Sequence, residues 1–268
     1  MHSTTFLIKI PAIILVNMGY KTIGAHRIAS KRALKSEPLV PTSSLDKRIW
    51  MDFVLKSYVR LCFFYRRLDA HAYIIIRRLC CLQIFQTIFS SLEIVMILAN
   101  TFPQYPITHS ILSNITFSSD AYSHQPRLTA MSALAAILVA VGIAIRLRAY
   151  EDMGDMFTAD VTIRKNHRLI KTGTYSIVRH PSYTGYLIAI TGWILWNLVE
   201  GSWLRESGLL ETWYGTIFAL VYATFVLLGV PVAITRIPKE DATLKKRFGK
   251  EWEEWAKNVP YALFPGIF

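Results

Sequence analysis

Charged residues are scarce in this sequence, and acidic residues are the scarcer kind. The 268 residues include 18 Asp and Glu against 30 Lys and Arg, a net charge of +12, and charged residues make up 18% of the chain. Soluble domains usually contain ~25%. Hydrophobic residues reach 53%, which excludes an intrinsically disordered chain. A nucleic-acid-binding protein would explain the basic excess but not the apolar fraction, whereas a membrane protein with cationic loops explains both.

Cysteine is also scarce, and its positions exclude two further classes of protein. The three cysteines are Cys62, Cys80 and Cys81, and they form neither a C-x-x-C motif nor a Cys/His spacing typical of zinc sites. We therefore expect no disulfide framework and no bound metal, and interpret the thiols as structural or acylated. The chain also lacks an internal repeat, which argues against a transporter built from duplicated halves.

Long hydrophobic runs are the main feature that is present. Four runs, 80–101, 128–145, 183–199 and 212–235, approach the ~20 residues needed to cross a bilayer. A fifth run, 6–20, is shorter and contains Lys9 and Pro11, so an interfacial helix or a signal peptide is an alternative for it. We expect an all-α, polytopic membrane bundle of about five transmembrane helices. Glu93 is the one acid well inside a run, and it either has a function or pairs with a neighbouring helix.

The cations are segregated into alternate connecting segments. Segments 21–79, 146–182 and 236–268 contain 13, 7 and 7 Lys and Arg, whereas 102–127 and 200–211 contain one each. The positive-inside rule places the first three segments, and with them the C-terminus, in the cytosol. Segments 102–127 and 200–211 are then lumenal or external, and 102–127 contains a glycosylation sequon at Asn114–Thr116.

The first segment with possible chemistry runs from His167 to Tyr186. Gly173 is a turn signal, and Pro181 ends any helix before it, so the next span is expected to begin at Ser182 or Tyr183. Free N–H groups at such a helix start suit an anionic ligand group. The side chains expected at this mouth of the bundle are Tyr175, Arg179, His180 and Tyr183. The alternative is a basic anchor with an aromatic belt.

The second segment runs from Arg236 to Pro265. Pro238 fits a first helical turn, and Glu240 and Asp241 follow where a helix N-terminus favours acids. Apolar side chains recur every three to four residues, which predicts an amphipathic helix over 239–257; they are Leu244, Phe248, Trp252 and Trp255. Arg236 and Glu240 lie four residues apart and share a face if this helix continues the preceding span. A simple ion pair between them is the alternative.

Three motifs in these segments resemble those of the isoprenylcysteine carboxyl methyltransferase family, whose members are integral membrane enzymes of the endoplasmic reticulum. They are H-x-L-I-x-x-G-x-Y from His167 to Tyr175, R-H-P-S-Y-x-G from Arg179 to Gly185, and R-x-x-x-E with F-G-K-E-W-x-x-W and V-P from Arg236 to Pro260. Membrane phospholipid N-methyltransferases carry a similar pattern and are the first alternative. A sterol reductase-like enzyme using NADPH and a non-catalytic membrane scaffold are alternatives from other classes.

The resemblance implies S-adenosyl-L-methionine as methyl donor and the C-terminal prenylcysteine of CaaX-processed proteins as acceptor, at the endoplasmic reticulum membrane. It implies that Arg236 is catalytic and binds the substrate carboxylate. Ten residues would bind the cofactor: His167, Arg168, Leu169, Ile170, Tyr175, His180, Pro181, Ser182, Tyr183 and Glu240. Asp160 departs from the family, which often has an amide there.

On this basis the chain divides into three parts. Residues 1–79 form an N-terminal segment with the doubtful first span and a basic cytosolic loop, and residues 80–145 form two transmembrane helices. Residues 146–268 form the catalytic region, with two transmembrane helices and the amphipathic helix. No family motif is recognised in 1–126, and no nucleic-acid partner is expected.

Overall fold

The computed structural model describes residues 7–18, 70–117, 125–156 and 168–267, and these ranges contain helices and irregular segments but no strand. The expected all-α fold is confirmed. The longer helices are α3 (Ala70–Thr101), α4 (Pro106–Ile115), α5 (Ala130–Met153), α6 (Pro181–Leu198), α8 (Trp213–Leu227), α9 (Gly229–Phe248) and α10 (Lys250–Asn258), together with a helix over Lys9–Met18. The short ones are η3 (Gly154–Met156), η4 (Gly173–Ser176), α7 (Trp203–Glu206) and η5 (Leu209–Glu211).

Four helical stretches in the described residues are long and apolar enough to cross a membrane: Gln83–Thr101, Ala130–Met153, Pro181–Glu206 and Trp213–Phe248. They coincide with the four long hydrophobic runs. In the described part of the fifth run, residues 7–18, the structure has the helix Lys9–Met18. At 1.5 Å per residue this helix is ~15 Å long, about half of the ~30 Å hydrocarbon core. Against the expected number of about five spans, the described residues thus contain four helices long enough to span a membrane and one short helix.

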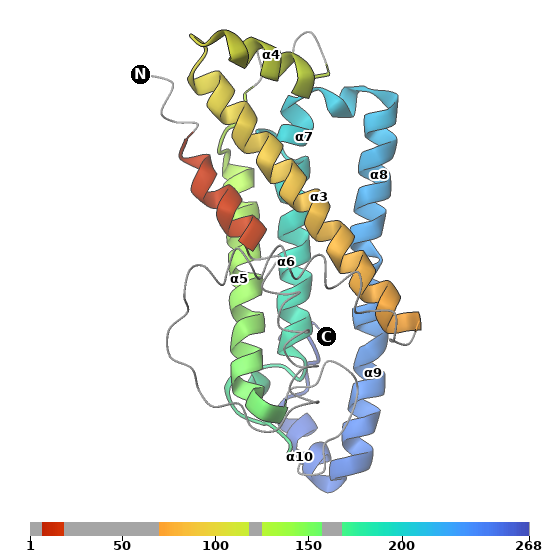
Figure 1. Ribbon diagram of the computed structural model, residues 1–268. Helices are drawn as coiled ribbons and strands as arrows, with labels where there is room; N and C mark the ends of the chain where they lie inside the picture. Colours follow the sequence, from red (N-terminus) through yellow and green to blue (C-terminus); the bar gives the residue numbers. More distant parts are fainter. Residues whose placement is uncertain (1–6, 19–69, 118–124, 157–167, 268) are drawn as a thin grey trace, which may run out of the picture.

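The two ends of the bundle differ as the distribution of cations predicts. Figure 1 shows α4 and α7, from the cation-poor segments 102–127 and 200–211, together at one end of the bundle. The end of α9 and all of α10, from the basic segment 236–268, lie at the opposite end, beside the start of α6. The grouping of the described connecting segments follows the expectation, whereas residues 21–69 of the most basic segment lie outside the described residues. The compartment that each end faces stays a prediction.

Helices α5 and α6 pack with their backbones almost in contact. A Cβ atom added at Gly142 of α5 would lie 2.5 Å from the carbonyl oxygen of Gly185, and one added at Gly192 would lie 2.7 Å from that of Ala135. Small residues that allow such an approach are typical of helix pairs in membranes, where close van der Waals packing stabilises association. The start of α6, which continues the R-H-P-S-Y motif from Pro181, is thereby held against α5.

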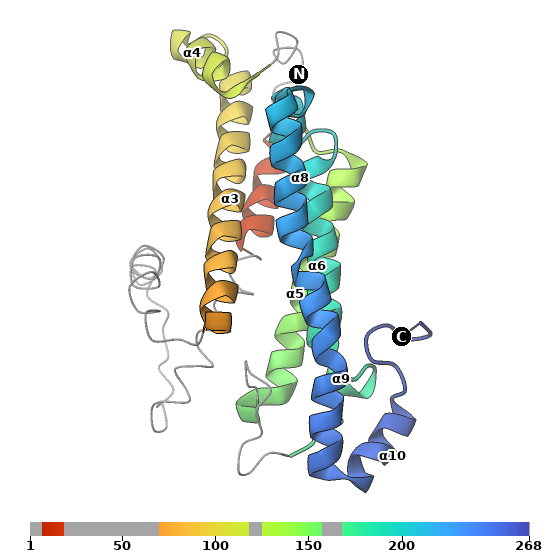
Figure 2. The same ribbon diagram turned by 90° about the vertical axis from the view of Figure 1, so that its right-hand side faces the viewer.

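The short helix Lys9–Met18 lies between α3 and the α5–α6 pair, as Figures 1 and 2 show from two directions. Its residues Ile13 and Val16 are completely buried in the main core. The indole Nε1 of Trp193 on α6 donates a hydrogen bond to the carbonyl of Val16 at 3.3 Å. The helix is therefore a packed part of the bundle and not a separate element on its surface.

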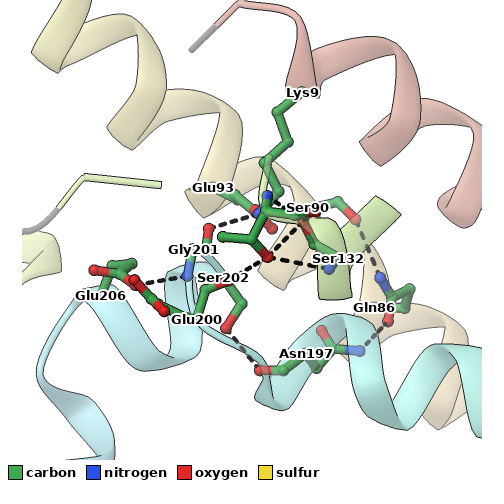
Figure 3. Close-up of polar contacts among 11 residues, drawn as sticks. Lys9, Gln86, Ser90, Glu93, Ser132, Asn197, Glu200, Gly201, Ser202 and Glu206 are labelled. Carbon is green, nitrogen blue, oxygen red and sulfur yellow. Dashed lines mark hydrogen bonds and ion pairs between the residues drawn. The ribbon is translucent and has the colours of Figure 1, made fainter. Parts of the chain in front are cut away.

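Lys9 and Glu93 form a buried ion pair between this short helix and α3, which Figure 3 shows with its neighbours. Lys9 is completely buried. Its Nζ also donates to the carbonyl of Gly201 at 2.5 Å and lies 4.9 Å above the ring of Trp196. The interpretation that Glu93 pairs with a neighbouring helix is confirmed.

The C-terminal helical region differs from its expected form. Instead of one helix over 239–257, α9 starts at Gly229, passes through Pro238 and ends at Phe248. Gly249, with φ of +54°, separates it from α10. Glycine adopts this left-handed conformation without a steric penalty, so it ends the helix there. Glu240 and Asp241 consequently lie in the interior of a helix and not at its N-terminus.

Candidate functional site

The C-terminal tail positions the R-H-P-S-Y motif at the start of α6. The backbone N–H groups of Arg179 and His180 and the hydroxyl of Thr184 donate hydrogen bonds to three successive carbonyls of residues 261–263, at 3.0, 2.9 and 2.7 Å. The Arg179 guanidinium also donates to the carbonyls of Val259 and Pro260. The V-P segment thus supplies backbone acceptors that hold the motif in place.

The centre of the candidate site is the His180–Glu240 cluster, which consists of His180, Tyr183, Arg236, Glu240 and Asp241. The imidazole of His180 lies between two carboxylates, with Nε2 3.0 Å from Asp241 Oδ1 and Nδ1 3.5 Å from Glu240 Oε2. The Tyr183 hydroxyl donates to Glu240 Oε1 at 2.5 Å. Arg236 Nε lies 3.4 Å from the same oxygen. The predicted shared face of Arg236 and Glu240 is confirmed, and so is the ion pair given as its alternative.

The sequence analysis missed the role of Asp241 in this cluster. Its second oxygen, Oδ2, lies 3.3 Å from Arg179 Nε, so one carboxylate binds both basic residues of the motif. The sequence suggested only a helix-terminal acid. Asp241 is 62 residues from Arg179, and no spacing rule connects positions so far apart. The available signal was the pair of adjacent acids at 240 and 241, both on the side of α9 that meets the motif.

His180 carries the clearest electrostatic perturbation of the site. Burial lowers its pKa, but the hydrogen bonds to Asp241 and Glu240 outweigh burial, and the net pKa is raised above the ordinary value of 6.5. With His180 protonated, the cluster holds two cations, His180 and Arg236, against the carboxylates of Glu240 and Asp241. Arg179, which lies against Asp241, adds a third cation, so the surroundings of the two carboxylates keep an excess of positive charge. Such an excess suits a ligand carrying a carboxylate.

This raised pKa predicts how stability depends on pH. A group whose pKa is higher in the folded than in the unfolded chain contributes its stability fully below the unfolded value, ~6.5 for histidine, and loses it as the pH rises through the folded value. We expect the melting temperature of the detergent-solubilised protein to exceed that of His180→Gln at acidic pH, and the difference to shrink in alkaline solution. Thermal unfolding across a pH series measures it. A difference independent of pH, or growing in alkali, would contradict the assignment.

A second cluster lies beside the first and is built around Tyr175 of η4. Tyr175 is buried against Ala149, Trp255 and Val259. Its carbonyl accepts a hydrogen bond from Trp255 Nε1 at 3.2 Å, which joins η4 to α10. Burial raises the pKa of the Tyr175 phenol, with the nearby Glu240 carboxylate adding to the effect, so this group stays protonated.

The remaining expected cofactor residues have different surroundings. Leu169 and Ile170 are half-buried and pack against the Tyr175 cluster, whereas Arg168 is exposed. Pro181 is buried, and the carbonyl of Ser182 accepts a hydrogen bond from Arg146 at 2.9 Å. His167 and the divergent Asp160 lie outside the described residues. Within the described ranges, no group of three His, Cys, Asp or Glu could hold a metal ion.

Comparison with known proteins relates this region to one family. Residues 134–246, which include Tyr175, His180 and Glu240, match the model of the isoprenylcysteine carboxyl methyltransferase (ICMT) family. A protein-S-isoprenylcysteine O-methyltransferase B of Arabidopsis thaliana is 31% identical over 125 residues, 46% of this chain and 54% of the relative. A probable protein-S-isoprenylcysteine O-methyltransferase of Oryza sativa subsp. indica is 33% identical over 129 residues, 47% of this chain and 58% of the relative. The resemblance inferred from the motifs is confirmed.

A second group of similar proteins is named for sterol reduction and not for methyl transfer. A delta(14)-sterol reductase of Mus musculus is 29% identical over 101 residues, 38% of this chain and 20% of that protein. The chain spans about half the length of the methyltransferases it matches and a smaller part of the reductase.

Proposed function

Because the His180–Glu240 cluster lies in the part of the chain that matches the ICMT family, we propose that this protein is a membrane methyltransferase acting on prenylated proteins. It transfers a methyl group from S-adenosyl-L-methionine to the C-terminal carboxylate of the prenylated cysteine. The observation that carries the proposal is the pairing of Arg236 with Glu240 at 3.4 Å, next to the motif at the start of α6. In this pairing Arg236, which can bind a carboxylate, lies beside Glu240, whose negative charge suits a cationic methyl donor.

Arg236 is proposed to hold the acceptor carboxylate. A C-terminal carboxylate has a reference pKa of ~3.3–3.7, so it is ionised at neutral pH and needs no general base. The guanidinium can hold such a group with two parallel hydrogen bonds, which fixes the direction of its attacking oxygen. The Arg236 side chain is 22% exposed, so an acceptor can reach it. Its role is to position the carboxylate and not to move a proton.

The residues around Glu240 fit a cationic methyl donor. When bound, S-adenosyl-L-methionine supplies a methyl group activated by a sulfonium. The Glu240 carboxylate and the aromatic rings of Tyr175 and Tyr183 stabilise positive charge nearby. The indole Nε1 of Trp252 is buried and has no hydrogen-bond partner among the described residues, so it offers a donor to a bound molecule. Leu169 and Ile170, half-buried beside Tyr175, would exclude water.

The membrane setting suits a lipid-modified acceptor. Apolar side chains are exposed along α8, among them Ile217, Leu220 and Val221, each more than half exposed. A surface of this kind is stable in contact with acyl chains, and a prenyl chain can approach the bundle from within the bilayer. We place the protein in the endoplasmic reticulum membrane with its C-terminus in the cytosol, so that the basic end with the His180–Glu240 cluster meets the soluble cofactor.

The two alternative enzymes differ from the proposal in donor or acceptor. A phospholipid N-methyltransferase would methylate an amine headgroup, whose attack on the same donor needs a neutral nitrogen and no carboxylate-binding arginine. A sterol reductase-like enzyme would bind NADPH. The similarity to a sterol reductase covers 38% of this chain, against 46–47% for the two methyltransferases. The reductase alternative therefore has less support than the methyltransferase.

A methyl-transfer assay on membranes containing the full chain tests the proposal. We expect labelled S-adenosyl-L-methionine to methylate N-acetyl-farnesylcysteine and not phosphatidylethanolamine. Bound donor should be displaced by S-adenosylhomocysteine and not by NADPH. Labelling of the phospholipid alone would favour the N-methyltransferase, and displacement by NADPH alone would favour the reductase.

A further inference from the structure

Asp152, in the last turn of α5, binds the turn that carries Tyr175. Its Oδ2 accepts hydrogen bonds from the backbone N–H of Thr174 at 2.7 Å and from the Thr174 hydroxyl at 2.8 Å. Its Oδ1 lies 3.4 Å from Arg148 Nε, and the side chain is only 10% exposed. The two oxygens thus have separate roles. Oδ1 pairs with Arg148, which orients the carboxylate, and Oδ2 binds Thr174 of η4.

The shape of η4 depends on this contact. Gly173, its first residue, has φ of +63°, and a Cβ atom there would lie 2.3 Å from Asp152 Oδ2. The backbone of the turn therefore rests directly on the carboxylate. On its other side the turn is held by the bond from Trp255 Nε1 to the carbonyl of Tyr175. A four-residue turn has little internal hydrogen bonding, so these two anchors hold its backbone, while the Tyr175 side chain packs against Ala149 and Met153 of α5.

We propose that Asp152 is a positioning residue for the methyl donor, an inference that rests on the proposed function. Asp152 acts through η4: by holding Thr174 from α5, it keeps Tyr175 beside Glu240 and keeps Ile170 against the Tyr175 cluster. Without the carboxylate, the Thr174 N–H loses its acceptor. The turn then keeps the bond from Trp255 of α10 and the weaker contacts of the Tyr175 side chain with Ala149 and Met153 of α5. Removal of the carboxylate should therefore weaken binding of the donor more than binding of the acceptor. Arg236, which is proposed to hold the acceptor, belongs to α9 and not to η4.

The test compares Asp152→Ala with Glu151→Ala in the membrane methyl-transfer assay. Glu151 carries the same charge one residue earlier and also pairs with Arg148, but its side chain is 68% exposed. For Asp152→Ala we expect KM for S-adenosyl-L-methionine to rise about tenfold, as for the loss of a charge-assisted hydrogen bond, with kcat and the acceptor KM changed less than about threefold. Asp152→Asn keeps one oxygen for Thr174 and should restore most of the donor affinity. Glu151→Ala should match the wild type.

A second readout does not depend on activity. The Thr174 amide should exchange its hydrogen faster in Asp152→Ala than in Glu151→Ala, as measured by mass spectrometry of the peptide covering Ile170–Val178. Thr174→Val, which removes only the hydroxyl, provides a milder variant if Asp152→Ala fails to accumulate, and it should raise the donor KM by a smaller factor.

Failure of this inference is distinguishable from failure of the proposed function. A wild-type protein that binds the donor and methylates prenylcysteine, together with an unchanged donor KM in Asp152→Ala, overturns the role of Asp152 alone. Equal effects on donor KM, acceptor KM and kcat would also overturn it, since they indicate general loss of structure. A wild-type protein that methylates no prenylcysteine counts against the proposed function instead.

Discussion

Substitution of Arg236 or Glu240 by alanine is expected to lower methyl transfer to a prenylcysteine analogue by at least about 100-fold, the usual scale for removing an electrostatic group at a reacting centre. Arg236→Ala removes the fork that holds the acceptor carboxylate. Glu240→Ala removes the shared partner of Arg236, Tyr183 and His180, which lie 3.4, 2.5 and 3.5 Å from its oxygens. The amount of membrane-inserted protein should stay close to that of the wild type.

The two variants should be separable by their kinetics. Arg236→Lys keeps the charge but loses the planar fork, so we expect a raised acceptor KM with the donor KM little changed. Glu240→Gln should mainly raise the donor KM, because the charge that faces the sulfonium is lost. Lys246→Ala, which removes an exposed cation in the last turn of the same helix, is the matched control and should be fully active. Near-normal activity of both alanine variants would remove the basis of the site assignment.

Breaking the Lys9–Glu93 pair is expected to have the largest effect on stability. Glu93→Ala leaves the completely buried ammonium of Lys9 without its counter-ion, and loss of one partner of a buried pair typically costs ~3–5 kcal/mol. Lys9→Ala leaves the carboxylate, whose side chain is only 4% exposed, in the same position. Thermal unfolding in detergent, followed by size-exclusion chromatography of the heated protein, measures the loss. We expect the melting temperature to fall clearly in each single variant.

Two further variants make this prediction specific. Lys9→Met combined with Glu93→Leu removes both charges and keeps side-chain volume, so it should be more stable than either single variant. Arg127→Ala breaks the exposed pair with Glu200 near the same end of the bundle, where both side chains are more than half exposed. That pair should contribute less than ~1 kcal/mol. A double variant as unstable as the single ones, or an equal effect of Arg127→Ala, would show that the buried charges are not the cause.

The sequence by itself determined the spans, the grouping of the loops and the region of the candidate site. These follow from local properties: an apolar run of sufficient length must be helical in a bilayer, and cations are excluded from its core. The pairing of Arg236 with Glu240 was predictable for the same reason, because residues four apart on a continuous helix share a face. The break at Gly249 was harder to predict, since the apolar spacing continues across it from Phe248 to Trp252.

Only the tertiary structure decided which distant side chains meet. Asp241 binds Arg179 and His180 across 62 and 61 residues of chain, and Lys9 binds Glu93 between a ten-residue helix and α3. No periodicity encodes such contacts, because they depend on how closely helices approach and on which face each helix turns inward. The near-contact of α5 and α6 at Gly142 and Gly185 is one such approach. Among the described residues, four acids of this basic sequence pair with specific cations on buried or half-buried faces: Glu93, Asp152, Glu240 and Asp241.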